Sequence, residues 1–167
     1  MKFIIDIIVI LVFGTTAFFL YQNYWDDIRA SLFDEDPVHT IYIGSTAIAV
    51  TIADSEEERI VGLGGTGSLR EREGKLFVFD EKERHGIWMK DMLIAIDIVW
   101  IDEDLQIVHF MENVSPETFP EVFVPPTDAR FVLEMNSHFV AALKLKVGDR
   151  LTLPAVLLPE DIRKNLQ

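Results

Sequence analysis

The sequence predicts a mainly β (α+β) fold: an antiparallel rolled sheet or small barrel of about seven strands with two short helices, preceded by one transmembrane helix. Three observations predict it. Residues 3–21 form one long apolar run. From residue 38 onward, short runs rich in β-branched residues alternate with turn residues, as strands and hairpins do. Strands do not alternate regularly with helices, which disfavours a parallel α/β sheet.

The first segment, residues 1–24, is predicted to be a membrane anchor. As a helix, residues 3–21 would span about 28 Å at roughly 1.5 Å per residue, close to the hydrocarbon thickness of a bilayer. Lys2 precedes this span, and Asp26 and Asp27 follow it. The positive-inside rule therefore places the N-terminus in the cytoplasm and the rest of the chain outside, as a single-pass protein of the cell membrane.

A cleaved signal peptide is the alternative for the same segment. Thr15 and Ala17 are small residues of the kind found before a cleavage site, and cleavage would give a secreted protein. The apolar run continues beyond that point as FFLY, which favours the retained anchor.

Three further segments follow the anchor. Residues 25–37 carry apolar side chains at helical spacing and end at Pro37, so they are interpreted as a juxtamembrane linker. Residues 38–160 are predicted to form the β-rich globular domain, and residues 161–167 a C-terminal tail.

Within the domain, each predicted strand is an apolar or β-branched run bounded by turn residues. TIYI and TAIAVTIA flank Gly44-Ser45 as a hairpin would, and AIDIVWI and QIVHFME flank the turn DEDL in the same way. KLFVFD, RFVLEM and the end of KVGDRLTL supply the remaining strands. Residues 114–129 contain four prolines and are predicted to be a long loop.

Two short helices are predicted. Asp54-Ser55 supplies an N-cap, and glutamates fill the first turn of the helix that follows. The glycines between residues 62 and 67 are interpreted as its end, because no lysine follows them in the position that a phosphate-binding loop requires. Asn136 is the predicted N-cap of the second helix, SHFVAAL.

Composition excludes several classes of function. The 28 acidic and 15 basic residues give a formal net charge of −13, and no basic stripe is present, so nucleic acid is not an expected partner. The absence of cysteine excludes disulfides, thiol catalysis and cysteine-ligated zinc. The histidines are scattered without the spacing of a metal-binding motif, so neither a metal nor another cofactor is predicted.

The order of these pieces resembles the Domain of Unknown Function 192 (DUF192) family over about residues 46–153. The segments that carry the resemblance are ADSEEERIVGL, EGKLFVFDEKERHGIWMKDMLIAIDIVWIDED, ARFVLEMNSHFV and LKVGDRL. The most specific part consists of Trp88, Met89, Lys90, Leu93, Asp97 and Ile98. The resemblance implies a compact, mainly β domain with small helices, commonly behind an export signal or anchor, and no established activity.

Two departures from the family pattern accompany this resemblance. The usual Gly-Leu-Met-Gly-Arg segment is here Gly62-Leu63-Gly64-Gly65-Thr66, which removes an arginine and any role it would have. The loop from Ser115 to Pro126, where many members carry a cysteine pair, has none.

Asp97 raises the question of why a carboxylate lies in an apolar strand. In an alternating strand it points away from Ile96 and Ile98 and lies between Ala95 and Val99 on the same face. An ionised carboxylate among apolar neighbours is costly unless it is paired or hydrogen-bonded. One structural interpretation pairs it with Lys90. Another has it accept backbone N–H groups in the bend at Asp91-Met92.

A functional interpretation remains open beside the structural one. Trp88, Lys90 and Asp97 would form one wall of a pocket with Glu134 and Asn136 opposite, and an aromatic face beside polar groups suits sugars or peptide termini. These five residues are the candidate ligand-binding residues.

No catalytic residue is assigned, and whether the protein is an enzyme stays undecided. The preferred hypothesis is a binding or scaffold module of the cell envelope with a glycan or protein partner. The alternative is an envelope hydrolase acting on glycan or cell-wall material, which would need two suitably separated carboxylates.

Overall fold

The computed structural model describes Tyr21 and residues 37–165. The chain divides into two units, Met1–Asp36 and Pro37–Gln167. The predicted anchor and linker therefore lie outside the described residues, except for Tyr21 and Pro37. Within the described residues, no helix has both the length and the apolar character needed to cross a membrane.

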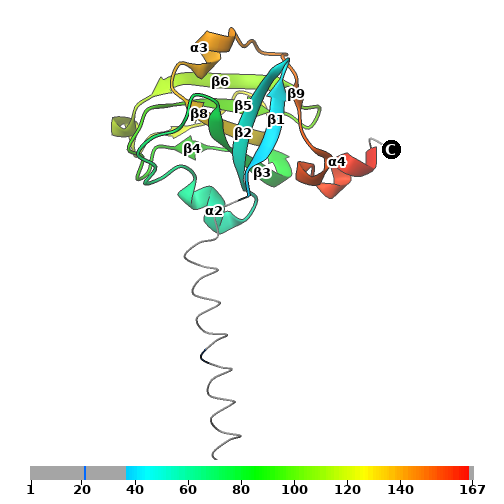
Figure 1. Ribbon diagram of the computed structural model, residues 1–167, viewed down its shortest axis with the longest axis horizontal. Helices are drawn as coiled ribbons and strands as arrows, with labels where there is room; N and C mark the ends of the chain where they lie inside the picture. The colour runs from blue at the N-terminus through cyan, green and yellow to red at the C-terminus, as the bar shows by residue number, and fades with distance from the viewer. Residues whose placement is uncertain (1–20, 22–36, 166–167) are drawn as a thin grey trace, which may run out of the picture. The chain divides into compact units, whose positions relative to one another are not determined.

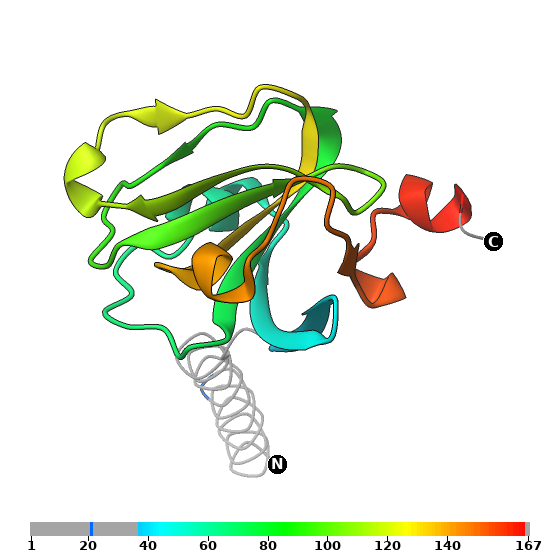
Figure 2. The same cartoon turned by 90° about the horizontal axis from the view of Figure 1, so that it is seen from above.

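The second unit is built on a seven-stranded sheet that curls into a half-barrel (Figures 1 and 2). Its strand order is β6-β5-β8-β3-β2-β1-β9. The strands are β1 His39–Ile43, β2 Thr46–Ala53, β3 Glu73–Glu83, β5 Ile96–Ile101, β6 Ile107–Val114, β8 Ala129–Asn136 and β9 Leu151–Thr152. The prediction of a mainly β fold with a rolled sheet is confirmed.

Shorter elements complete the unit. Strands β4 Ile87–Trp88 and β7 Val122–Phe123 pair as a separate two-stranded sheet. The α-helices in the described residues are α2 Glu56–Val61, α3 Phe139–Leu143 and α4 Glu160–Asn165, and short 3-10 turns occupy Pro116–Thr118 and Ala155–Leu157. Three short helices thus replace the predicted two. Figure 1 shows α2 and α3 at opposite ends of the sheet.

The pairing of β2 with β3 corrects the expectation of a purely antiparallel sheet. These two strands run parallel, from Ala49 opposite Glu73 to Ala53 opposite Phe77. Parallel neighbours need a crossover connection. Residues 54–72 form it and include α2, so the helix is part of the connection that makes the parallel pair possible.

Helix α2 begins with a capping box, as the N-cap prediction required. The Glu58 backbone N–H donates to the Ser55 hydroxyl at 3.2 Å, and the Ser55 backbone N–H donates to the Glu58 carboxylate at 3.0 Å. This exchange satisfies two N–H groups that would otherwise lack partners at the start of the helix. The helix ends at Gly62, whose φ of +53° is disfavoured for residues with a side chain.

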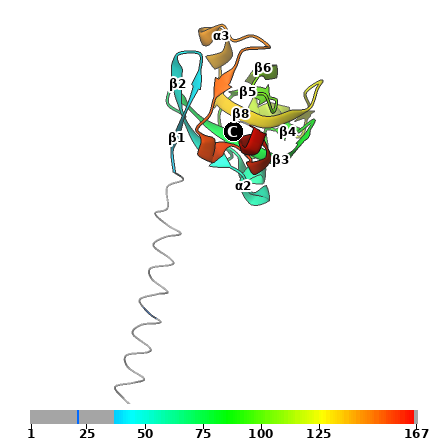
Figure 3. The same cartoon turned by 90° about the vertical axis from the view of Figure 1, so that its right-hand side faces the viewer.

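Both faces of the curled sheet are buried, which gives the unit two apolar clusters. Strand β5 is buried at every position from Ile96 to Ile101. One cluster contains Val99, Leu133 and Met135, and the other contains Ile98 and Val132. Successive residues of a strand therefore point into different clusters. Figure 3 shows β1 and β2 on one side of the unit and β4 on the other.

Residues 161–165, assigned above to a tail, belong to α4. Ile162 is 8% exposed and packs into the cluster that contains Leu133. Asp161 accepts a hydrogen bond from the guanidinium of the buried Arg130 at 2.8 Å. The helix is therefore attached to the sheet by one apolar and one charged contact.

Candidate functional site

Asp97 is fully buried, and its carboxylate is satisfied by backbone groups. Oδ1 accepts the N–H groups of Asn113 at 2.8 Å and His138 at 3.1 Å, and Oδ2 accepts that of Val140 at 2.8 Å. Asn113 lies at a register shift of β6, and the other two donors lie at the start of α3. Three donors to one carboxylate offset the cost of burying its charge. Asp97 thus joins the irregular end of β6 to the N-terminus of α3.

The predicted Lys90–Asp97 pair is wrong. Lys90 is exposed, and within residues 37–165 it forms no ion pair with Asp97, which is inaccessible to solvent. The second structural hypothesis correctly predicted that backbone N–H groups donate to the Asp97 carboxylate. The donors come from β6 and α3 instead of the bend at Asp91-Met92, because Asp97 faces the cluster on the α3 side of the sheet.

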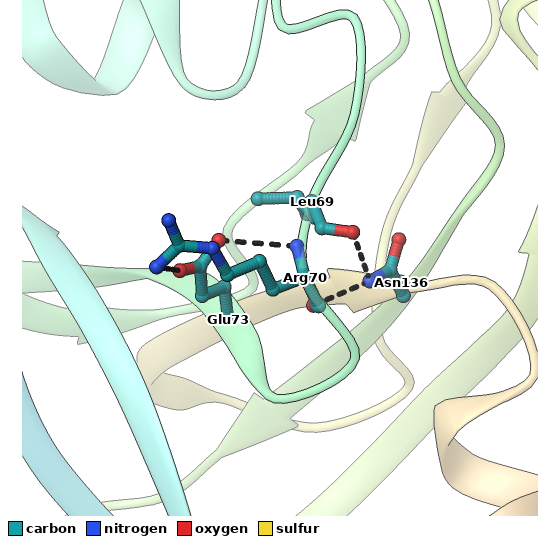
Figure 4. A network of polar contacts seen from close by, with 4 residues as sticks. All are labelled: Leu69, Arg70, Glu73 and Asn136. Atoms are coloured by element: carbon teal, nitrogen blue, oxygen red, sulfur yellow. Dashed lines mark hydrogen bonds and ion pairs between the residues drawn. The ribbon is translucent and has the colours of Figure 1, made fainter.

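Asn136 is a structural contact as well. Its side-chain N–H groups donate to the carbonyl oxygens of Leu69 at 2.9 Å and Arg70 at 2.6 Å (Figure 4). Arg70 is held further by Glu73, whose carboxylate accepts the Arg70 backbone N–H at 3.0 Å. Asn136 therefore fixes the connection that leads into β3. The prediction that Asn136 is the N-cap of α3 is wrong. His138 occupies the N-cap position, and its side chain makes no capping hydrogen bond.

Glu134 lies on the other face of the sheet from Asp97. In the β5–β8 register, Glu134 is opposite Ile98 and Asp97 is opposite Met135, and these partners belong to the two different apolar clusters. The structure therefore does not bring the two carboxylates together. It places Glu134 with Trp88 and Lys90 instead.

These three residues line a small cavity, here called the Glu134 pocket. Its volume is about 40 Å³, which is room for roughly two or three water molecules. Walls are supplied by α2, the turn after it, β3 and the segment around β4. The residues used below are Arg59, Gly62, Leu63, Phe77, Trp88 and Lys90, with Glu134 from β8.

The carboxyl of Glu134 is buried but only half satisfied. The residue is 3% exposed, and it accepts a hydrogen bond from the backbone of Leu63. Its second oxygen, Oε2, has no hydrogen-bond partner among the described residues. A Cβ added at Gly62 would lie 3.5 Å from Oε2 and 3.1 Å from Cζ of Phe77. A side chain at position 62 would therefore crowd the Phe77 ring and contact Oε2.

Burial raises the pKa of Glu134 to about 8. The Leu63 hydrogen bond and the positive charge of Lys75, which lies directly opposite on β3, act in the other direction. Because the shift leaves this pKa above neutrality, the carboxyl keeps its proton at pH 7 in most molecules. A protonated carboxyl has an O–H to donate as well as an oxygen to accept.

The rim of the pocket combines an aromatic ring with cationic side chains. Trp88 is 43% exposed, and the ring of Phe119 packs edge-on against it at a centroid separation of 6.5 Å. Lys90 is exposed at the same rim. Arg59 is fixed by a hydrogen bond to the carbonyl oxygen of Val78 at 2.9 Å and by the Phe79 ring at 5.2 Å.

Glu134 is the one acidic residue among those that line the pocket. A two-carboxylate hydrolytic centre of the kind that glycosidases use is therefore not formed by these described residues. Within the same part of the chain, no group of three or more histidine, aspartate or glutamate side chains is placed to hold a metal ion.

Several pocket residues were not among the sequence-based candidates. Arg59, Gly62 and Leu63 belong to α2 and to the turn that ends it, and their sequence signal was interpreted as a helix end only. The glycines at 62, 64 and 65 gave a further signal, because such residues also permit a close approach of backbone to a ligand. The close approach of Gly62 to Glu134 depends on the position of β8, which the sequence around Gly62 does not indicate.

Comparison with known proteins assigns the family. The model of DUF192, described as an uncharacterized ACR, matches residues 39–153. The chain belongs to the DUF192 family. No curated protein matches it. The matched range of this DUF192 chain includes Arg59, Trp88, Lys90 and Glu134, so the pocket lies within the family domain.

Two solved structures share the fold of this DUF192 chain. One is a protein from Sinorhizobium meliloti 1021 described as a candidate transcription regulator, with 26% identity and a TM-score of 0.64 over 68% of this chain and 90% of that one. The other is a protein of unknown function from Novosphingobium aromaticivorans, with 22% identity and a TM-score of 0.65 over 68% of this chain and 84% of that one.

Proposed function

We propose that this DUF192 chain is a binding module of the cell envelope whose ligand enters the Glu134 pocket. The observation that carries the proposal is the carboxyl of Glu134, a residue that lines the cavity and whose buried Oε2 has no hydrogen-bond partner among the described residues. A buried polar atom without a hydrogen bond costs about 1–3 kcal/mol, so a ligand group that supplies the bond recovers this free energy.

The pocket limits what can enter it. A volume of about 40 Å³ accepts a hydroxyl, amide or carboxyl group, but not a whole sugar ring or side chain. The remainder of the ligand would lie against the exposed ring of Trp88. A polar floor beside an aromatic rim is common in sites for small organic ligands and for groups presented by glycans or peptide ends.

Binding is favoured over glycan hydrolysis because the residues that line the pocket include one carboxyl group instead of two. Retaining and inverting glycosidases place two carboxyl groups about 5–9.5 Å apart across the scissile bond. Glu134 is the one carboxyl among the lining residues, and Asp97 faces the other side of the sheet with its oxygens occupied by backbone N–H groups. We therefore propose a binding role without hydrolysis.

The binding role predicts a response at Trp88. Full-length chain in non-ionic detergent is titrated with glucose, acetamide and propionate, and the indole N–H signals are followed by NMR. At least one compound is expected to move the Trp88 signal with millimolar affinity. The buried Trp100, whose indole N–H donates to the His85 carbonyl at 2.8 Å, serves as the internal reference.

Two variants make this test specific. Glu134→Met keeps the side-chain length but removes both oxygens, and it is expected to weaken binding by tenfold or more. Glu112→Gln removes an exposed carboxylate and is expected to change nothing. The proposal fails if none of the three compounds moves the Trp88 signal, or if Glu134→Met binds as well as the natural chain.

The proposed location rests on residues 3–21. We expect the chain to stay in the membrane fraction through an alkaline carbonate wash, because an apolar span of this length inserts into the bilayer. A variant that lacks residues 3–21 is expected to be released by the same wash. Intact-mass measurement checks the N-terminus, and a mature chain that begins near residue 18 would contradict the retained anchor.

A further inference from the structure

Resting on the proposed function, we infer that the Glu134 pocket binds the carboxylate group of a small organic acid. The Glu134 carboxyl donates its proton in a hydrogen bond to that group, and the Lys90 ammonium at the rim supplies the opposite charge. The apolar part of the ligand lies along the exposed side chains of Ile60, Val61 and Trp88.

The charges around the pocket favour an anion. Arg59 on α2 and Lys90 after β4 both line it. The chain as a whole carries a formal net charge of −13, so this concentration of positive charge is a local departure from an acidic protein. A cationic ligand would meet the like charges of Arg59 and Lys90, whereas a carboxylate would be attracted to them.

The acidic side chains near the pocket, apart from Glu134, do not line it, so they do not neutralise the positive charges of Arg59 and Lys90 inside it. Glu58 on α2 is exposed, and its carboxylate accepts the backbone N–H groups of Asp54 and Ser55. Asp91, next to Lys90, is exposed and is not among the lining residues. Glu134 is thus the carboxyl among the lining residues, and within the described part of the chain its Oε2 has no hydrogen-bond partner.

The dimensions of the site restrict the ligand further. About 40 Å³ accommodates a carboxylate group and little else, so the rest of the molecule must lie outside the cavity. The exposed fractions at the mouth are 49% for Ile60, 61% for Val61 and 43% for Trp88. A monocarboxylic acid with a short apolar body matches a polar cavity under an apolar rim.

The protonation state of Glu134 gives this inference a characteristic pH dependence. Below its pKa of about 8, the carboxyl holds a proton and can donate it to the ligand carboxylate. Above pH 8 the proton is lost, and two carboxylates would face each other. The affinity for a carboxylate should therefore fall by up to about tenfold per pH unit above 8. A cationic ligand would show the opposite trend.

The experiment uses propionate as the probe and propionamide as its neutral analogue. Full-length chain in non-ionic detergent is titrated between pH 6 and 9.5, and the Trp88 indole signal reports binding. We expect propionate to bind at least fivefold more tightly than propionamide at pH 6.5, and to lose at least tenfold in affinity by pH 9.5.

Substitutions at Glu134 separate proton donation from simple shape. Glu134→Gln keeps an N–H donor at all pH values, so propionate binding should be retained at pH 6.5 within about threefold and should not fall above pH 8. Glu134→Met has no donor and should bind at least tenfold more weakly throughout. Folding of each variant is confirmed from the dispersion of its amide signals before titration.

A lysine pair tests the counter charge. Lys90→Met should weaken propionate binding by about three- to tenfold and leave propionamide binding unchanged, because the amide carries no charge. Lys146→Met removes an exposed lysine that does not line the pocket and should affect neither compound.

The possible results discriminate between the two proposals. Equal binding of propionamide and propionate, or a stronger response to methylammonium that grows above pH 8, would overturn the carboxylate assignment and leave the binding function standing. Failure of propionate, propionamide and methylammonium to move the Trp88 signal would overturn the carboxylate assignment, and with the glucose and acetamide titrations it would remove the binding function too.

Discussion

Asp97→Ala is expected to lower the free energy of unfolding by about 3–6 kcal/mol, which is a large part of the total stability of an ordinary domain. The change leaves the backbone N–H groups of Asn113, His138 and Val140 without an acceptor in a buried region. Each buried donor that loses its partner costs about 1–3 kcal/mol. Urea unfolding of the full-length chain in non-ionic detergent measures the loss.

Asp97→Asn gives a finer test of the same geometry. The amide has one acceptor oxygen, and its NH₂ group must face either the Val140 N–H or the N–H groups of Asn113 and His138. We therefore expect a loss of about 2–4 kcal/mol. Asp104→Asn, at an exposed position, is the matched control and should stay within about 0.5 kcal/mol of the natural chain.

Combining these changes with Lys90→Met distinguishes the observed contacts from an ion pair. Lys90 is exposed and lines the Glu134 pocket, whereas Asp97 contacts backbone groups on the other face of the sheet, so the effects of the two substitutions should add within about 0.5 kcal/mol. Partial recovery of stability in the Asp97→Asn, Lys90→Met double variant would contradict the structure, because it would show that the two charges interact.

Local sequence signals predicted the elements whose partners are close in the chain. The β1–β2 hairpin follows from two β-branched runs around Gly44, which has a φ of +59°. The β5–β6 hairpin follows in the same way from the runs around residues 102–105. Helix α2 begins at the residues whose side chains cap it. In each case, short-range hydrogen bonds or turn geometry decide the conformation.

Features that depend on distant partners could not be predicted from such signals. The parallel β2–β3 pair is set by the crossover of residues 54–72, and the β4–β7 pair joins segments more than thirty residues apart. Helix α4 is short and mostly polar, and it is attached by Ile162 and Asp161 to strands far away in the sequence. Nothing in residues 160–165 alone indicates these contacts.

The five candidate ligand-binding residues fall into two groups, and the sequence could not separate them because the separation depends on distant partners. Strand alternation correctly separated Asp97 from its neighbours Ile96 and Ile98, but alternation within one strand does not say which face holds a cavity. The β5–β8 register decides this, because it places Glu134 opposite Ile98 and Asp97 opposite Met135. Two of the sequence candidates, Asp97 and Asn136, are therefore occupied by backbone partners, while Trp88, Lys90 and Glu134 line one pocket.

Glu134 is expected to make the protein less stable as the pH rises from about 4.5 to 8. The folded-state pKa of about 8 lies above the ordinary value of 4.5, so between these values the folded chain holds a proton that the unfolded chain has lost. Stability then falls by up to about 1.4 kcal/mol per pH unit, because the unfolded state binds fewer protons. Below pH 4.5 the penalty is absent, and above pH 8 it is fully present.

Glu134→Gln isolates this contribution, because glutamine fills nearly the same volume and does not titrate. The variant and the natural chain should have similar free energies of unfolding near pH 4.5, and the variant should become the more stable by roughly 3–5 kcal/mol near pH 9. Taking the difference between the two proteins at each pH removes the effect of every other titrating group. Urea midpoints between pH 4 and 9.5 supply the curve. A difference that stays constant above pH 5 would mean that Glu134 is already ionised at neutral pH, and the pocket would then present a carboxylate to its ligand instead of a proton donor.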